Sequence, residues 1–265
     1  MNLKKTEPKI FFLCALPRSG NTLFASIMNQ NPDLVVTADS ITLLILSRIF
    51  LLKREANFLN FPDHQSLDEV LKMVYPSFYK NWNYKYIIDR GPVGAIGNLT
   101  LVKKYLKQPI KCIVLLRDLM DVLASYIKLF ETDPTSFVNR YGNSIEEKLN
   151  FIMSDQGKVV QELKCIEHLM KPENRQMAYF FKYNDFVLNP EKYIKEVYQF
   201  LEIPYFNHTF VDLDQLVING IAYDDSVMGK NMHTIRTKEV KKLDNPYKEK
   251  IPEKIKQKYG HIKFL

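Results

Sequence analysis

Short apolar runs alternate with segments of helical periodicity along most of the chain. Each run has the length of a strand, and the segment after it repeats apolar residues every three or four positions. Strands that alternate with helices usually pair in parallel, because each helix carries the chain back along the sheet. The pattern predicts an α/β fold with three layers, in which helices flank a mainly parallel central sheet. The predicted strands are residues 10–15, 33–36, 85–89, 110–116 and 177–181.

Helical periodicity predicts the layers that cover this sheet. The segment 41–52 is the most apolar, but it carries Arg48 and is far shorter than the ~20 apolar residues of a membrane span. It is interpreted as a buried helix or, alternatively, as one wall of an apolar substrate pocket. No linker, low-complexity tract or repeat divides the chain, so residues 1–265 are predicted to form one domain. Helices are predicted near residues 23–28, up to residue 55, and near 67–78, 99–106, 120–130, 144–170 and 190–201.

Composition and charge narrow the classes of function. The net charge of +7 attracts polyanions, but the lysines of residues 238–258 are interspersed with Glu and Asp, so no nucleic-acid face is predicted. The five histidines lack the spacing of a metal site, and none is expected. The widely spaced Cys14, Cys112 and Cys165 indicate reduced, buried thiols. No signal peptide is recognisable, which predicts a cytoplasmic protein.

The first predicted strand runs into a loop that suits an anion. Residues 10–28 read IFFLCALPRSGNTLFASIM, which is a strand, a turn with Pro17 and Gly20, and a helix. The first amides of a helix lack partners within it, and their partial positive charge favours a phosphate or a sulfate. An ordinary turn with a surface arginine is the alternative.

This loop differs from the phosphate-binding loop of nucleoside triphosphatases. The pattern GxxxxGK[ST] would need Gly in place of Ala15 and Lys in place of Asn21. The cation stands three positions earlier, at Arg18, while Thr22 keeps a hydroxyl near the start of the helix. The sequence therefore predicts an anion site of another kind.

Each predicted strand is followed by a conspicuous polar residue. Ligands of parallel sheets bind beyond the carboxyl ends of the strands, so these residues are candidates for one site. They are Arg18, Asp39, Arg90, Arg117 and Tyr183.

The segment VLLRDLMDVLASY carries a second anion-binding pattern. Arg117 leaves the end of a strand, and Ser125 follows eight residues later, about two helical turns along. A guanidinium and a hydroxyl together suit a phosphate monoester. Taken alone, the segment also fits an ion pair of Arg117 with Asp118 or Asp121 and a packing role for Ser125.

Three motifs in this order resemble the sulfotransferase family, which uses 3'-phosphoadenosine 5'-phosphosulfate (PAPS). They are LPRSGNT at residues 16–22, the Arg117–Ser125 spacing, and YNDFVLNPEKYIKEVYQFLEIP at residues 183–204. The resemblance extends over residues 10 to about 205, with a weaker similarity over 229–236. It is nearest to the branch with the loop PRSG[TN]T, which includes protein-tyrosine sulfotransferases and bacterial relatives.

The resemblance implies a PAPS site made of three parts. The loop from Arg18 to Leu23 would hold the 5'-phosphosulfate, Arg117 and Ser125 would hold the 3'-phosphate, and Tyr183 would lie beside the nucleotide. A later loop would fold over the donor. The implied donor-binding residues are Arg18, Ser19, Gly20, Asn21, Thr22, Leu23, Arg117, Ser125, Tyr183, Lys230, His233, Thr234 and Arg236.

The resemblance also implies catalytic residues. Sulfuryl transfer to a hydroxyl needs a base for the acceptor proton and cations near the leaving oxygen. By position, Asp39 matches the carboxylate base, and Arg90 matches a cation that would act with Arg18. Asp39 is shorter than the usual glutamate, and Arg90 replaces lysine. The alternatives are a helix cap for Asp39, a salt bridge of Arg90 to Asp89, and a base at His208 or His233, which would titrate near 6.5.

The predicted activity is in-line transfer of a sulfuryl group from PAPS to a hydroxyl of an acceptor, without a metal. A small-molecule kinase of the P-loop type and a catalytically silent nucleotide-binding protein are the other hypotheses. The Leu-, Phe- and Tyr-rich residues 42–86 indicate either an apolar or aromatic acceptor pocket or plain core. No sequence pattern bears on the oligomeric state.

Overall fold

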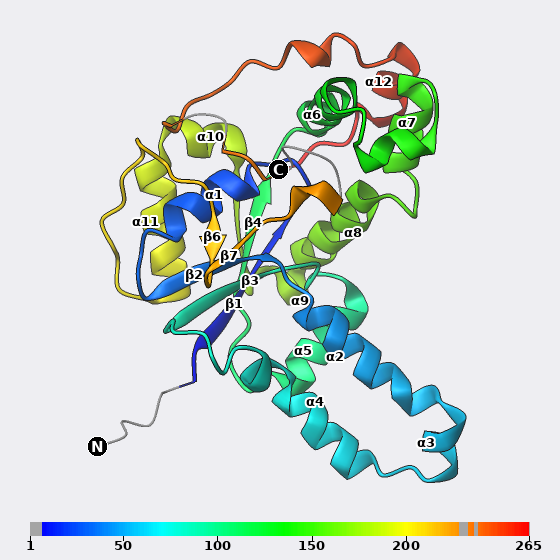
Figure 1. The fold of residues 1–265 in the computed structure, drawn as a ribbon, viewed down its shortest axis with the longest axis vertical. Helices are drawn as coiled ribbons and strands as arrows, with labels where there is room; N and C mark the ends of the chain where they lie inside the picture. Colours follow the sequence, from blue (N-terminus) through cyan, green and yellow to red (C-terminus); the bar gives the residue numbers. More distant parts are fainter. Residues whose placement is uncertain (1–6, 228–232, 236–237, 265) are drawn as a thin grey trace.

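A computed structural model describes residues 7–227, 233–235 and 238–264. Its centre is a parallel five-stranded sheet in the order β2-β3-β1-β4-β5 (Figure 1). The predicted fold class is therefore confirmed, and each predicted strand is present within a few residues of its predicted bounds. The strands are β1 (Lys9–Ala15), β2 (Leu34–Asp39), β3 (Tyr86–Arg90), β4 (Cys112–Leu116) and β5 (Ala178–Lys182).

The central strand β1 is buried on both faces. Its alternate residues enter two different hydrophobic clusters: Phe12 and Cys14 belong to one, whereas Phe11 and Leu13 belong to the other. Such two-sided burial explains why the strand is a continuous apolar run rather than an alternating one. All three cysteines are buried and free, as the sequence predicted.

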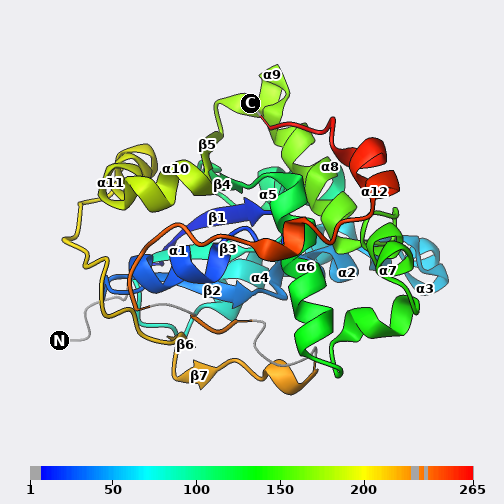
Figure 2. The same ribbon diagram turned by 90° about the horizontal axis from the view of Figure 1, so that it is seen from above.

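Helices cover both faces of the sheet (Figure 2). One face packs against α1 (Asn21–Met28), α10 (Tyr183–Leu188) and α11 (Pro190–Leu201). The other face carries the larger cluster. Its helices are α2 (Thr42–Leu51), α4 (His64–Phe78), α5 (Ile96–Tyr105), α6 (Leu119–Thr132), α7 (Ile145–Ile152) and α8 (Lys158–Met170).

The helix α2 is amphipathic rather than buried all round, since Leu43 and Leu46 are buried while Leu44 is 53% exposed. With the next two helices it forms a projecting arm, visible at the lower right of Figure 1. No helix among the described residues is long and apolar enough to cross a membrane.

Shorter elements complete the described part of the chain. They are η1 (Leu52–Arg54), α3 (Ala56–Asn60), η2 (Phe137–Tyr141), α9 (Pro172–Arg175), β6 (Val217–Ile218), β7 (Ile221–Ala222), η3 (Asp225–Val227), η4 (Pro246–Lys248) and α12 (Glu253–Tyr259).

The prediction of a single helix over residues 144–170 is wrong, because the helix is interrupted between α7 and α8. Two turns intervene, closed by hydrogen bonds from Ser154 N to Phe151 O (3.0 Å) and from Gly157 N to Ser154 O (2.8 Å). A Cβ on Gly157 would lie 2.1 Å from the carbonyl oxygen of Ile152, so only glycine fits this close approach. The break starts α8 afresh at Lys158.

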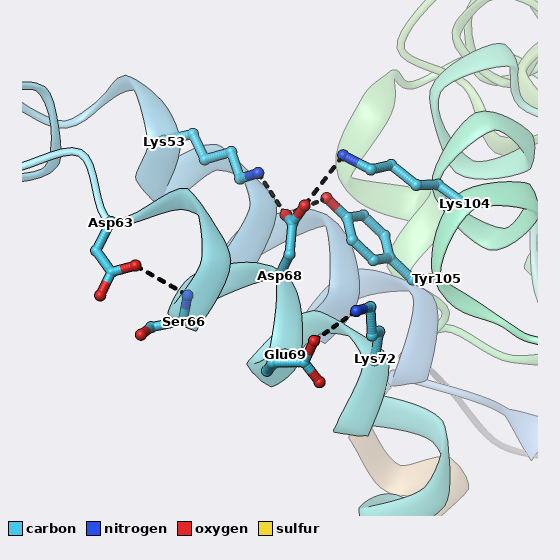
Figure 3. Close-up of polar contacts among 8 residues, drawn as sticks. All are labelled: Lys53, Asp63, Ser66, Asp68, Glu69, Lys72, Lys104 and Tyr105. Atoms are coloured by element: carbon cyan, nitrogen blue, oxygen red, sulfur yellow. Dashed lines mark hydrogen bonds and ion pairs between the residues drawn. The ribbon is translucent and has the colours of Figure 1, made fainter.

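Asp68 joins the projecting arm to the body of the protein (Figure 3). Its carboxylate accepts hydrogen bonds from Lys53 Nζ at 2.5 Å and from the Tyr105 hydroxyl at 2.7 Å, and it forms an ion pair with Lys104 Nζ at 3.3 Å. These donors come from η1 and α5, so one side chain of α4 links three elements. The hydrogen bonds, that from Lys53 above all, lower the pKa of Asp68.

We predict that Asp68→Asn destabilises the protein by about 1 kcal/mol, since the amide loses the charge that two lysines pair with. The pKa is lower in the folded state than its ordinary 3.8, so the stabilisation is present at neutral pH and is lost as the pH falls below about 4. Urea unfolding at pH 7 and pH 3 measures both effects. Glu69→Gln is the matched control, because Glu69 is exposed and its ion pair is with Lys72 of its own helix. Equal unfolding curves for Asp68→Asn and Glu69→Gln would contradict the role of Asp68.

Candidate active site

The loop between β1 and α1 has the form expected of an anion site. Gly20 has a φ of 95° and Arg18 a φ of 65°, which turns the chain sharply into the helix. The Ser19 hydroxyl and the Asn21 amide both donate to the Leu16 carbonyl and hold the loop in place. The N-cap residue Gly20 has no side chain that could cap the start of α1. The first amides of the helix are therefore left to bind an anion.

Tyr183 closes one side of this loop. It begins the helix α10 rather than lying in a loop, because the chain turns into a helix directly after β5. A Cβ on Gly20 would lie 2.4 Å from Tyr183 Cε2, so the backbone and the ring are in close contact. The Arg117 guanidinium stacks over the same ring, with its Cζ 4.5 Å from the centroid.

The structure brings Arg18, Arg117 and Ser125 together. Arg117 Nη1 donates to the Arg18 carbonyl at 2.6 Å, and Arg18 Nε donates to Ser125 Oγ at 3.2 Å. Arg117 Nε is buried without a hydrogen-bond partner among the described residues. These contacts place the two predicted anion sites next to each other.

The alternative of an Arg117 ion pair with its acidic neighbours is not observed among the described residues. Asp118 and Asp121 lie 3.5 Å and 3.0 Å from Lys248 Nζ instead. Asp118 also caps the start of α6, where it accepts from the Asp121 amide. The Arg117 guanidinium is therefore directed toward the loop after β1.

A cavity of about 250 Å³ lies over the β1–α1 loop. It contains most of the predicted donor-binding residues, although Ser19 is fully buried beneath the loop and does not line it. Lys230 and Arg236 lie outside the described residues. Sequence reasoning missed Lys128 and the segment 243–247, because the latter reaches the site from the far end of the chain. The predicted residues that line the cavity are Arg18, Gly20, Asn21, Thr22, Leu23, Arg117, Ser125, Tyr183, His233 and Thr234.

A second cavity, of about 290 Å³, adjoins the first. Four residues line both cavities: Pro17, Asn21, Arg90 and His233. A group bound at this junction is accessible from both sides. The other lining residues of the second cavity are Leu13, Ala15, Asp39, Gly91, Tyr126, Phe137, Lys158 and Glu162.

Asp39 and Arg90 face each other at the ends of β2 and β3, where they are partners in the sheet register. The Arg90 guanidinium lies 3.5 Å from the Tyr223 hydroxyl. Asp39 does not cap α2, since the Ser40 hydroxyl accepts from the Thr42 amide. No ion pair joins Arg90 to Asp89 in the described structure.

Asp89 lies instead in the interior, away from this site. It is fully buried, and burial raises its pKa to about 7.

The two histidines considered as alternative bases lie in different places. His233 Nδ1 lies 2.6 Å from Asp225 Oδ1, and its ring stacks on Tyr223 with centroids 3.9 Å apart. Burial lowers the pKa of His233. His208 bonds to the Tyr198 hydroxyl at 3.0 Å and lines neither cavity.

Two charged residues of the second cavity had no signal in the sequence analysis. Lys158 and Glu162 are one helical turn apart on α8, and their side chains form an ion pair at 3.0 Å. The prediction of one uninterrupted helix over 144–170 hid them. If Gly157 had been taken as the start of a new helix, Lys158 and Glu162 would have been placed together on its first turns. Neither cavity is lined by residues 42–86, whose apolar side chains pack mainly in the core and the arm.

Comparisons with solved structures find sulfotransferases at low sequence identity. A sulfotransferase from Alicyclobacillus acidocaldarius has 13% identity and a TM-score of 0.50, over 77% of this chain and 85% of that one. The sulfotransferase domain of the curacin biosynthetic pathway has 15% identity and a TM-score of 0.49, over 98% and 93% of the two chains. Mouse sulfotransferase SULT7A1, complexed with PAP, has 14% identity and a TM-score of 0.48, over 77% and 62%. No curated protein sequence matches the chain.

A comparison with models of protein families assigns the chain to a family directly. The model of the sulfotransferase domain matches residues 96–260, which is more than half of the sequence. The chain therefore belongs to the sulfotransferase domain family, and the resemblance found in its motifs is confirmed at the level of the family.

We predict that Gly20→Ala destabilises the protein by about 1–3 kcal/mol, because a side chain at this positive φ is strained and meets the Tyr183 ring. Gly97→Ala is the control: Gly97 lies in α5, and nothing lies within 4 Å of a Cβ added there. The control should be neutral or slightly stabilising. Thermal and urea unfolding of both variants measures the difference. An unchanged stability of Gly20→Ala would show that the loop can open without cost.

Proposed function

We propose that this protein transfers a sulfuryl group from PAPS to a hydroxyl of a small acceptor, within one domain that spans residues 1–265. The donor occupies the first cavity and the acceptor the second. The observation that carries this proposal is the junction of the cavities, where Arg90 and His233 line both and Asn21 begins α1. A sulfuryl group held at the start of α1 is in reach of an acceptor on the other side.

The donor is held at both ends by groups that the sheet brings together. The loop amides and Arg18 bind the 5'-phosphosulfate, and Arg117 with Ser125 binds the 3'-phosphate. This assignment is supported by the unpartnered Arg117 Nε and by the hydrogen bond from Arg117 to the Arg18 carbonyl, which fixes the guanidinium beside the loop. The Arg18–Ser125 contact would open when the phosphate binds between them.

The charges at the junction match the charge changes of the reaction. As the acceptor oxygen attacks sulfur in line, its proton passes to the Asp39 carboxylate, and the bond to the bridging phosphate oxygen breaks. Arg18 and Arg90 stabilise the negative charge that develops on that oxygen and on the sulfuryl group. The register pair Asp39 and Arg90 thus places a base and a cation on adjacent strand ends.

We predict that adenosine 3',5'-bisphosphate raises the melting temperature much more than ATP with Mg²⁺ does, because only the former carries the 3'-phosphate for Arg117 and Ser125. Differential scanning fluorimetry over a range of nucleotide concentrations measures the two shifts. A larger shift with ATP and Mg²⁺ would favour a kinase. Strong nucleotide binding with no sulfated product from any hydroxyl acceptor would favour a catalytically silent protein.

Replacement of the two arginines should separate catalysis from binding. Arg18→Ala is expected to lower turnover by about 10²–10⁴-fold, the range for loss of a group that stabilises transition-state charge. Arg117→Ala should mainly weaken the binding of adenosine 3',5'-bisphosphate, as measured by calorimetry. Arg175→Ala is the control, because Arg175 stacks on Phe180 and lines neither cavity. Unchanged nucleotide affinity in Arg117→Ala would refute the 3'-phosphate assignment.

Asp39→Asn should lower kcat by about 10²–10⁴-fold while it leaves nucleotide affinity unchanged, because the amide cannot accept the acceptor proton. His233→Gln should have a smaller effect on kcat, and His208→Gln none. Product formation with a phenol acceptor and PAPS measures the three variants. A greater loss of kcat in His233→Gln than in Asp39→Asn would make His233 the base.

A further inference from the structure

The second cavity contains an ion pair that the proposed reaction does not use. Glu162 lies on its wall with a side chain that is 6% exposed, and Lys158 Nζ is 3.0 Å from Glu162 Oε1. The other carboxylate oxygen, Oε2, accepts a long hydrogen bond from the Cys14 thiol, at 3.9 Å. Burial raises the pKa of Glu162.

The pair is weak as a device for stability, since Glu162 is buried but the Lys158 side chain is 43% exposed. The cost of removing the Glu162 carboxylate from water offsets most of its attraction to a partly solvated lysine, so apolar residues of similar size would stabilise the fold about equally well. Apolar residues would also suit the helix α8, which packs on the large core cluster through Val159 and Leu163. The position of the pair on a cavity wall indicates a role toward a ligand.

The remaining walls of this cavity restrict the ligand further. Tyr126 from α6 and Phe137 from η2 supply aromatic surface, and Leu13 and Ala15 of β1 supply apolar surface. The volume of about 290 Å³ is at the small end for ligand sites, which fits a molecule of one or two rings.

The charges around the cavity balance one another. Glu162 and Asp39 are carboxylates, whereas Lys158 and Arg90 are cations, and Lys158 interacts electrostatically with all three of the others. Burial acts to lower the pKa of Lys158, but the carboxylates of Glu162 and Asp39 raise it above its ordinary value. A charged acceptor would disturb this balance in a partly enclosed site, whereas a neutral one would not.

We propose, on the basis of the proposed function, that Lys158 and Glu162 bind a second hydroxyl of the acceptor, so that the substrate is a small, uncharged aromatic diol. One hydroxyl faces Asp39 and Arg90 and receives the sulfuryl group. The other donates a hydrogen bond to Glu162 Oε2 and accepts one from Lys158. A hydroxyl is a neutral group that can donate to the carboxylate and accept from the ammonium through a single atom.

Binding of size-matched phenols tests this assignment. The probes are resorcinol, 3-methylphenol, 3-hydroxybenzoate and 3-hydroxybenzylamine, and their affinities are measured by calorimetry on the protein with and without adenosine 3',5'-bisphosphate. The dissociation constant of resorcinol should be at least about 10-fold lower than that of 3-methylphenol, which is the ratio expected for a hydrogen bond to a charged group. In Glu162→Gln and in Lys158→Met this ratio should fall to about twofold or less.

Two neighbours on α8 provide matched controls. Glu167 and Lys164 lie on the exposed side of the same helix, so Glu167→Gln and Lys164→Met should keep the wild-type ratio. If either single variant of the pair fails to fold, the double variant Lys158→Met with Glu162→Met removes both charges together and should fold. It should bind 3-methylphenol at least as tightly as resorcinol.

The outcomes distinguish this inference from the proposed function. Equal affinity of resorcinol and 3-methylphenol in the wild type would overturn the diol, as would tightest binding of the benzoate or the benzylamine, which would assign the pair to a charged acceptor. Loss of nucleotide binding would instead count against the proposed donor. The panel without nucleotide still reports on the acceptor cavity in that case.

Discussion

The hydrogen bond from Arg117 to the Arg18 carbonyl is the contact on which the site depends. It joins the chain after β4 to the loop after β1, and these strands are neighbours in the parallel sheet. Parallel pairing places both strand ends at one edge, so residues 99 positions apart meet without any local sequence signal. The left-handed turn at Arg18 and Gly20 then directs the amides of α1 into the same space.

The same edge supplies the second half of the proposed site. Asp39 and Arg90 end the two strands on the other side of β1. The ends of β2, β3, β1 and β4 therefore carry, in this order, the proposed base, the proposed cation, the loop and the arginine proposed to bind the 3'-phosphate. The register between β2 and β3 places the Asp39 and Arg90 side chains next to each other. A slip of one residue between β2 and β3 would turn one of these two side chains to the opposite face.

The sequence was sufficient for the elements with a strong local pattern. The strands are continuous apolar runs because both faces of the sheet are covered, and the helix α11 begins at Pro190 and ends at Leu201 as predicted. The loop residues were predicted because their motif resembles that of the sulfotransferase family. Most of the predicted donor residues therefore line one cavity.

The remaining parts depend on long-range packing, which a single sequence does not display. Residues 42–86 were predicted to form either an acceptor pocket or plain core. In the structure they form the arm and part of the core, and the second cavity is lined in part from α6, η2 and α8. Lys158 and Glu162 were hidden by the assumption of one long helix. The helix is interrupted before Gly157, and the turn there requires glycine because a carbonyl of the preceding turn leaves no room for a Cβ.

A crystal structure with adenosine 3',5'-bisphosphate tests the central claim most directly. We expect the 5'-phosphate on the amides at the start of α1 and the 3'-phosphate between the Arg117 guanidinium and the Ser125 hydroxyl, with the Arg18–Ser125 hydrogen bond opened. A nucleotide bound elsewhere, or bound here with its 3'-phosphate away from Arg117 and Ser125, would contradict it.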